Sequence, residues 1–177
     1  PAYTLTSSLS LTAWVNPTGA PVGGNGETAL LGADTGYALS YYTNGNAYFY
    51  IGGGSFNIST GLTQNAWTFL VGTWDGTDMV LYKDGIQVAT MARATTLGVP
   101  GESLKSGVTL GSFTAGFDGQ LNEARLYNGA LTSAEVLAAY NAGPIPVPEP
   151  GAVSLLVVAG ALMFRGRGAR SLRSVSL

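Results

Sequence analysis

Short stretches of alternating apolar and polar residues run through most of the chain, and turn-forming residues separate them. Alternation with a period of two is typical of β-strands that bury one face. The expected strands cover residues 9–15, 67–74, 79–82, 86–91, 107–111 and 120–127. Because Asp84-Gly85 separates two of these strands, we expect a tight hairpin there. With about ten short strands in all, the pattern favours an antiparallel β-sandwich.

One helix is indicated near residue 140. Thr132 and Glu135 have the Thr-x-x-Glu spacing of a capping box, in which each side chain satisfies a backbone amide of the other residue. Gly143 suits the end of a helix, because glycine adopts positive φ without strain. We therefore expect a short helix over residues 133–140. Its apolar side would pack on the sandwich through Val136, Leu137 and Tyr140.

A tyrosine-rich hairpin is expected over residues 37–51. If Thr43-Asn44-Gly45 forms a three-residue loop with Gly45 at positive φ, Tyr42 pairs with Asn46. The core face then holds Tyr37, Leu39, Tyr41, Ala47, Phe49 and Ile51, and the other face holds Ala38, Ser40, Tyr42, Tyr48 and Tyr50. A two-residue loop would shift the register and break this grouping.

Composition and charge exclude several classes of protein. Hydrophobic residues make up 46% of the chain and charged residues 10%, which excludes a disordered polyelectrolyte. The chain has no cysteine and no histidine, so disulfides, thiol chemistry and the commonest general base are excluded. Residues 1–146 contain four basic and nine acidic residues, and they offer no basic surface for nucleic acid.

The C-terminal part consists of three segments in series. Alternate prolines over residues 144–150 disfavour helix and sheet and predict an extended, semi-rigid spacer. An uncharged run of 14 residues, 151–164, follows, and an arginine-rich tail ends the chain. We divide the chain into a β-sandwich (1–143), a Pro-rich spacer (144–150) and an apolar helix with its tail (151–177).

The apolar run has two interpretations. It is shorter than the roughly 20 residues that span a bilayer, although snorkelling arginines would extend a membrane helix. A cluster of arginines then places the tail in the cytoplasm and the sandwich on the other side of the membrane. The alternative is a buried terminal helix. Against it, the run is apolar all round and prolines separate it from the sandwich.

Four motifs of the sandwich, at residues 14–17, 67–76, 81–85 and 117–131, occur in a characteristic order. Together they resemble the LamG-like branch of the concanavalin A-like lectin/glucanase superfamily, over residues 3–141. The resemblance implies an antiparallel jelly-roll β-sandwich whose first strand lies mostly before Tyr3. The chain departs from the family where it has Asn122-Glu123, since the usual pair is Asp-Glu.

A second resemblance covers the C-terminal segments. Pro148-Glu149-Pro150, the apolar run and the arginine cluster that begins with Arg165 and Arg167 are similar to the PEP-CTERM protein-sorting signal. The resemblance implies an exported protein of a Gram-negative bacterium that a membrane-bound, exosortase-type enzyme sorts. It would be anchored in the membrane during sorting and would then reach the cell surface or the extracellular matrix.

The acidic residues do not indicate catalysis. Glycoside hydrolysis needs two carboxylates that flank the scissile bond, and the Glu-x-Asp-x-x-Glu pattern of the glucanase relatives is absent. Asp75, Asp84 and Asp118 each precede a glycine, which is typical of turns. We therefore expect a protein that is not an enzyme. A glucanase-type hydrolase would need an unexpected pairing of acids.

Calcium is the metal that the composition leaves open, because calcium binds oxygen ligands and needs neither histidine nor cysteine. The family resemblance implies a structural calcium in some relatives. The candidate ligands here are the Asp34 and Glu123 carboxylates and the Asn122 amide oxygen. The alternative is that these are surface or hydrogen-bonded side chains.

The most suggestive binding feature is the outer face of the tyrosine hairpin. Tyr42, Tyr48 and Tyr50 could stack on the apolar face of a sugar, with Asn46 and Ser40 as hydrogen-bond partners. The alternative is that they form ordinary cross-strand pairs. We therefore expect a surface-sorted protein that binds polysaccharide or mediates adhesion in an extracellular matrix. The alternative is a structural spacer or coat protein without a ligand.

Overall fold

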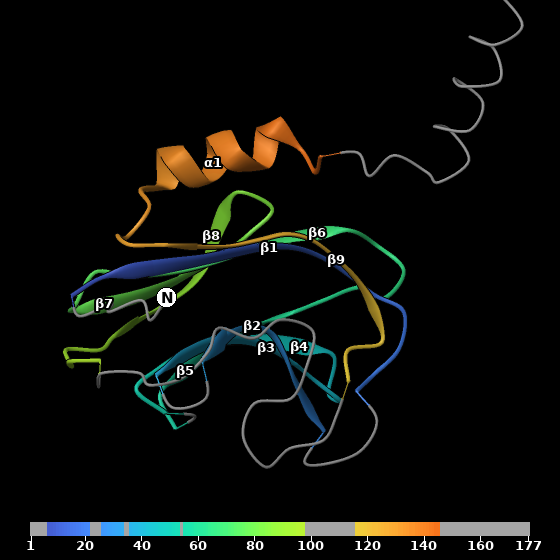
Figure 1. Ribbon diagram of the computed structural model, residues 1–177, viewed down its shortest axis with the longest axis horizontal. Coiled ribbons are helices and arrows are strands. Elements are labelled where there is room, and N and C mark those ends of the chain that lie inside the picture. Colours follow the sequence, from blue (N-terminus) through green and yellow to red (C-terminus); the bar gives the residue numbers. More distant parts are fainter. Residues whose placement is uncertain (1–6, 22–25, 34–35, 54, 98–115, 146–177) are drawn as a thin grey trace, which may run out of the picture. The chain divides into compact units, whose positions relative to one another are not determined.

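Two antiparallel sheets lie face to face in the computed structural model, and a helix covers the outer side of one of them (Figure 1). The structure describes residues 7–21, 26–33, 36–53, 55–97 and 116–145. The chain divides into two compact units, Pro1–Pro144 and Ile145–Leu177, and the sandwich lies in the first. The expected strand at 107–111, the apolar run and most of the spacer lie outside the described residues.

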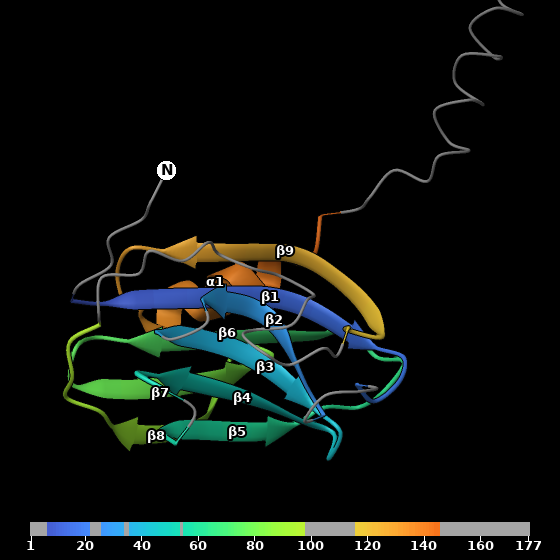
Figure 2. The same cartoon turned by 60° about the horizontal axis from the view of Figure 1, so that its bottom comes forward.

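The five-stranded sheet has the order β8-β7-β6-β1-β9, and the four-stranded sheet has the order β2-β3-β4-β5. The strands are β1 (Leu9–Pro17), β2 (Glu27–Ala33), β3 (Tyr37–Tyr42), β4 (Asn46–Ile51), β5 (Asn57–Gly61), β6 (Thr68–Trp74), β7 (Asp78–Lys83), β8 (Ile86–Ala92) and β9 (Gly119–Tyr127). Strands β8 and β5 lie at the same edge of the sandwich (Figure 2). The described residues confirm the predicted all-β sandwich with a short helix.

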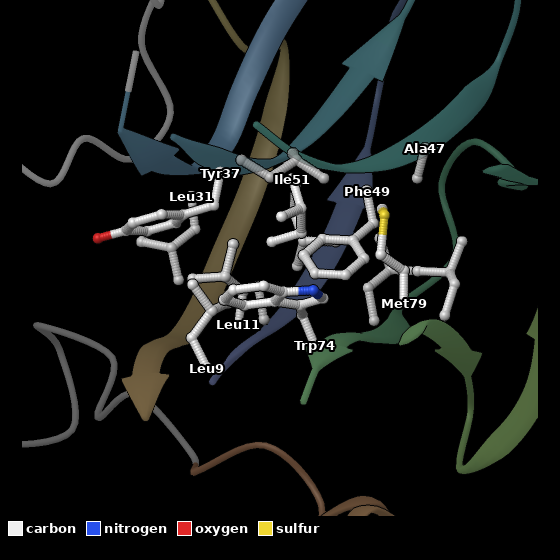
Figure 3. Close-up of a cluster of buried hydrophobic side chains, with 14 of the residues drawn as sticks. Leu9, Leu11, Leu31, Tyr37, Ala47, Phe49, Ile51, Trp74 and Met79 are labelled. Carbon is white, nitrogen blue, oxygen red and sulfur yellow. The ribbon is translucent and has the colours of Figure 1, made fainter. Parts of the chain in front are cut away.

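The core lies between the sheets (Figure 3). Leu9, Leu11, Trp74 and Met79 enter it from the five-stranded sheet, and Tyr37, Phe49 and Ile51 enter it from the four-stranded sheet. The ring of Phe49 lies directly over Gly72 of β6, where a Cβ would come within 2.4 Å of the ring. Glycine at this position therefore allows the two sheets to approach closely.

Both predicted hairpins form with the expected turns. Tyr41 pairs with Ala47, and Gly45 has φ of 80°, so the loop between β3 and β4 has three residues and the predicted register is correct. In the turn between β7 and β8, Asp84 and Gly85 have φ of 52° and 81°. Positive φ at both central residues is what a tight hairpin turn requires.

Helix α1 (Ser133–Ala142) packs on the outer side of the five-stranded sheet and extends two residues beyond the predicted end. The capping box of Thr132 and Glu135 forms as predicted, and the N–H of Gly143, at φ of 70°, donates to the carbonyl of Tyr140. Val136 is fully buried there, but Leu137 is 46% exposed. Leu137 is therefore less buried than predicted, although its side chain lies against the turn at Gly85, because consecutive helical residues point about 100° apart. Within the described part, no helix has the length and apolar character to cross a bilayer.

Strands β2 and β5 were not predicted. Most of β2 is buried on both faces, so its sequence is almost uniformly apolar and lacks the alternation of a half-exposed strand. Strand β5 has only five residues and ends in glycine. Burial on both faces did not by itself hide a strand, because β1 and β6 are also almost entirely buried and were predicted.

Candidate functional site

The tyrosines of the predicted site lie on the outer face of the four-stranded sheet. The strand registers arrange the side chains of this face in three rows that cross β2, β3, β4 and β5. The rows are Glu27–Tyr42–Asn46–Gly61, Ala29–Ser40–Tyr48–Ser59 and Gly32–Ala38–Tyr50–Asn57. The inner face of the same strands holds the core residues, as the predicted hairpin register requires.

Tyr50 is not exposed. Only 8% of the residue is accessible, and its hydroxyl donates a hydrogen bond to Ser40 Oγ, 2.5 Å away. Tyr50 pairs with Ala38, and Ser40 lies two residues farther along β3, so the ring lies down across the neighbouring strand. It forms a small cluster with Ala29 and Ala38, whose short side chains leave room for it. The predictions that Tyr50 is exposed and that Ser40 contacts a ligand are wrong.

Tyr42 and Tyr48 form the partly exposed end of this face. Their ring centroids are 4.6 Å apart, and the rings are tilted by 60°. The side chain of Asn44, in the hairpin loop, donates to the Tyr48 hydroxyl at 2.8 Å and accepts the N–H of Asn46 at 3.0 Å. These contacts hold the aromatic pair and the hairpin loop in one arrangement.

The two hydroxyls of this pair differ in their partners. Partial burial, and then the hydrogen bond that it donates to Glu27, raises the pKa of Tyr42, so this hydroxyl stays protonated. The hydroxyl of Tyr48 accepts a hydrogen bond from the Asn44 amide, and its own O–H remains available as a donor. Together with the Asn46 amide in the row of Tyr42, the pair combines apolar ring surface with hydrogen-bonding groups at its rim.

Residues 1–137 match the family described as the concanavalin A-like lectin/glucanases superfamily. The chain belongs to this superfamily. No curated protein matches the sequence.

Solved structures share the superfamily fold at low identity. The chain is 17% identical to a heptameric SAP-like pentraxin from Limulus polyphemus, with a TM-score of 0.64 over 81% of this chain and 74% of the pentraxin. It is 18% identical to a putative carbohydrate binding protein from Bacteroides ovatus, with a TM-score of 0.64 over 77% of this chain and 42% of that protein. It is 22% identical to domain 4 of an extracellular arabinanase from Geobacillus stearothermophilus, solved with arabinotriose. The TM-score is 0.60 over 75% of this chain and 66% of that domain.

Glycoside hydrolysis needs paired carboxylates, but the acids that precede glycines in this chain accept hydrogen bonds from nearby groups of the chain. Asp75 Oδ1 accepts hydrogen bonds of 2.8 Å from the N–H groups of Thr77 and Asp78 and from the Thr77 hydroxyl. The hydrogen bond from Asp78, followed by those from Thr77, holds its pKa below the usual value. Asp84 accepts the N–H of Phe69 at 2.9 Å, and Asp118 accepts the hydroxyl of Thr18 at 2.8 Å. The predicted turn roles of Asp75 and Asp84 are confirmed, whereas Asp118 lies just before β9 and its carboxylate binds a side chain.

Two of the three predicted calcium ligands, Asn122 and Glu123, lie in the described part of the chain. Asn122 and Glu123 lie next to each other on β9, where the pairing with β1 shifts register and Glu123 has φ of 50°. Glu123 Oε2 forms an ion pair with Arg125 at 3.2 Å. Asp34 lies outside the described residues, and among those described no three carboxylates gather around a metal position. The Glu123 carboxylate is thus engaged by Arg125, and calcium binding by Asp34, Asn122 and Glu123 stays a prediction because Asp34 is not among the described residues.

Sequence reasoning missed two residues of the tyrosine site, Glu27 and Asn44. Glu27 lies on β2, which lacks the periodicity of a strand, so its position opposite Tyr42 could not be predicted. Asn44 was predicted to be a loop residue, and it stands four positions before Tyr48 in the sequence. Its hydrogen bond to the Tyr48 hydroxyl was not predicted. The predicted sorting residues Pro148, Glu149, Pro150, Arg165 and Arg167 lie outside the described residues.

Proposed function

We propose that this chain is a non-catalytic carbohydrate-binding protein and that Tyr42 and Tyr48 form its contact surface. The observation that carries the proposal is the pair of partly exposed rings, 4.6 Å apart, at one end of an outer sheet face. A tyrosine ring offers a flat apolar surface that can stack on a sugar ring, and its hydroxyl adds a polar rim. Stacking of this kind needs no charge, which suits a chain with 10% charged residues.

The surrounding residues supply the polar part of the proposed site. The hydroxyl of Tyr48 can donate to a sugar hydroxyl while it accepts from Asn44. Asn46, in the row of Tyr42, offers both a donor and an acceptor. Tyr50 has a different role here, because it lies flat on β3 and supports the sheet surface beside the exposed pair.

Fold neighbours support a binding role. The Bacteroides ovatus structure is described as a putative carbohydrate binding protein, and the Geobacillus stearothermophilus domain was solved with arabinotriose. The chain matches less than half of the first of these proteins, so we extend only the binding of a carbohydrate to it, and no particular sugar. The hydrogen bonds of the Asp75 and Asp84 carboxylates to the backbone, and of Asp118 to the Thr18 hydroxyl, support a function without hydrolysis.

We also propose that the protein is exported and sorted to the cell surface. This part rests on the order of Pro148-Glu149-Pro150, the apolar run and the arginines, including Arg165 and Arg167, in the sequence. An exosortase-type enzyme in the membrane would be the sorting partner. Binding of a matrix polysaccharide would then take place outside the cell.

Affinity electrophoresis in gels that contain neutral polysaccharides tests the binding proposal with the full chain. We expect at least one polysaccharide to retard the wild-type protein. Y42A and Y48A should each weaken the retardation about fivefold, because one exposed aromatic contributes about 1 kcal/mol. Y127A is the matched control, since Tyr127 lies on β9 in the other sheet.

Three outcomes would contradict the proposal. Absence of retardation by a broad panel of polysaccharides would favour a structural spacer or coat protein. Equal effects of Y127A and Y48A would show that the aromatic pair is not the contact surface. Release of reducing sugars from any of the polysaccharides would favour a hydrolase.

A further inference from the structure

An almost uncharged surface lies on the helix side of the sandwich. It consists of α1, with ten residues, and the edge strand β8, with seven, and Glu135 is the one charged residue in these two elements. Ile86, Val88 and Leu137 are 68%, 44% and 46% exposed. They are three of the six large apolar side chains that the described part of the chain exposes. We call these three residues the helix-side patch.

Leu137 of the helix-side patch lies against the turn that precedes Ile86 and Val88. A Cβ at Gly85 would lie 3.0 Å from Leu137 Cδ1, so Leu137 rests on the turn that leads directly into Ile86. Farther along β8, Ala89 and Met91 pack against the core, and Val88 lies at a register shift beside them and is exposed. One short turn thus brings together apolar side chains that are about fifty residues apart in the sequence.

The charged groups next to the helix-side patch are engaged in hydrogen bonds. The Lys83 ammonium donates to the carbonyl of Gly61, and Asp84 accepts the N–H of Phe69. Glu135 accepts hydrogen bonds from the backbone N–H and the hydroxyl of Thr132. A surface whose charges are already satisfied loses less on leaving water than one with free ions.

We propose that the helix-side patch docks on a lipid surface while the apolar run 151–164 is inserted in the membrane. This inference rests on the proposed sorting of the protein, with the apolar run as the membrane anchor before sorting. Helix α1 ends at Ala142, and the Pro-rich spacer of residues 144–150 follows. Seven residues span at most roughly 25 Å. In a chain anchored through residues 151–164, this length limits how far α1, and Leu137 on it, can move from the lipid.

The position of the tyrosine site is consistent with this orientation. Helix α1 lies outside the five-stranded sheet, and strands β2 to β5 form the opposite layer of the sandwich (Figure 1). Docking through the helix-side patch therefore turns the outer face with Tyr42 and Tyr48 away from the lipid. The carbohydrate-binding surface would stay accessible while the protein is anchored.

The spacer of residues 144–150 would tether the sandwich to the membrane, so a weak contact between the helix-side patch and lipid is enough for docking. Three partly exposed aliphatic side chains give only marginal, reversible partitioning by themselves, as a single short acyl chain does. A short linker raises the effective concentration of the docking surface to the order of millimolar, so marginal affinity produces substantial occupancy. A second copy of the chain is the competing occupant of the same surface, and the test below separates it from lipid.

Because the chain has no cysteine, single labelled cysteines can test the docking. The full chain is reconstituted in phosphatidylcholine vesicles with an environment-sensitive fluorophore at V88C, at T43C in the β3–β4 loop, or at L155C in the apolar run. We expect nitroxide-labelled lipids to quench the probes at V88C and L155C and to leave the T43C probe unquenched. Adding L137E should abolish quenching at V88C and leave quenching at L155C unchanged.

The remaining outcomes overturn the inference in distinguishable ways. Quenching at L155C without quenching at V88C would refute the docking alone and leave the anchoring intact. Absence of quenching at L155C would refute the membrane insertion and the docking with it. A blue shift at V88C without lipid quenching, together with a dimer in detergent, would assign the helix-side patch to a second copy.

Discussion

The indole N–H of Trp74 donates to the backbone carbonyl of Arg93, 2.8 Å away and just beyond the end of β8. The side chain of Arg93 contacts the four-stranded sheet. Its Nε donates to the carbonyl of Ile51 at 3.1 Å, and its guanidinium carbon lies 3.6 Å from the ring centroid of Phe56. Trp74 belongs to the five-stranded sheet and Ile51 to the four-stranded sheet, so Arg93 links the two layers.

The substitution R93M is expected to lower the free energy of unfolding by about 1–2 kcal/mol. It removes a hydrogen bond from a charged donor and a cation–π contact, and it keeps most of the aliphatic volume. Urea denaturation measures the effect. R125M is the matched control, because Arg125 is half exposed and its ion pair with Glu123 is expected to contribute less than about 1 kcal/mol. Equal losses in the two variants would refute the linking role of Arg93.

Substitutions of Tyr50 and Tyr48 should differ in their effect on stability, because Tyr50 is buried and Tyr48 is partly exposed. We expect Y50A to cost about 3 kcal/mol of stability, because it empties the space of a buried aromatic ring. Y48A should cost about 1 kcal/mol, since its ring is partly exposed and loses mainly the contact with Tyr42. Thermal unfolding of both variants measures the difference. A larger loss for Y48A than for Y50A would contradict the described arrangement of this face.

Acid should destabilise the sandwich in part through Asp75 and Glu135. Hydrogen bonds to Asp78 and Thr77 lower the pKa of Asp75 from 3.8, and hydrogen bonds to Thr132 lower the pKa of Glu135 from 4.5. The unfolded chain therefore takes up protons at a higher pH than the folded protein. The stabilisation is present above these ordinary values and disappears as the pH falls through the lowered values.

The urea midpoint of the wild type should accordingly decrease as the pH is lowered below 4.5. The double variant D75N/E135Q should show a flatter decrease over the same interval. D78N is a suitable control, because the Asp78 side chain makes only a long contact of 3.4 Å with Thr77. A double variant with the same slope as the wild type would contradict the assignment.

The sorting proposal predicts a shorter mature protein. In its native host, the protein should lose the residues after Pro150 on its way to the surface, because the spacer, apolar run and arginines occur in series. Mass spectrometry of the surface fraction identifies the C-terminus. Recovery of a surface protein that ends at Leu177 would refute this prediction.

Much of the local geometry could be predicted because it depends on residues that are close in sequence. Thr132 and Glu135 are three residues apart, and Asp84-Gly85 and Thr43-Asn44-Gly45 each form one turn. The conformational preferences of these residues are set by sterics and by short-range hydrogen bonds. Once the loop of the tyrosine hairpin had three residues, the period of two assigned every side chain to a face.

Which of those side chains meets solvent was decided by the tertiary structure. Tyr42, Tyr48 and Tyr50 share one face, and nothing in their spacing distinguishes them. Tyr50 is buried because its ring lies over β3 and joins a cluster with Ala29 of β2, a strand that the sequence pattern did not indicate. In the same way, Arg93 reaches a carbonyl about forty residues away only because the sheets pack face to face. Burial and partners across a sandwich depend on chain segments far apart in sequence, and short-range preferences carry no information about them.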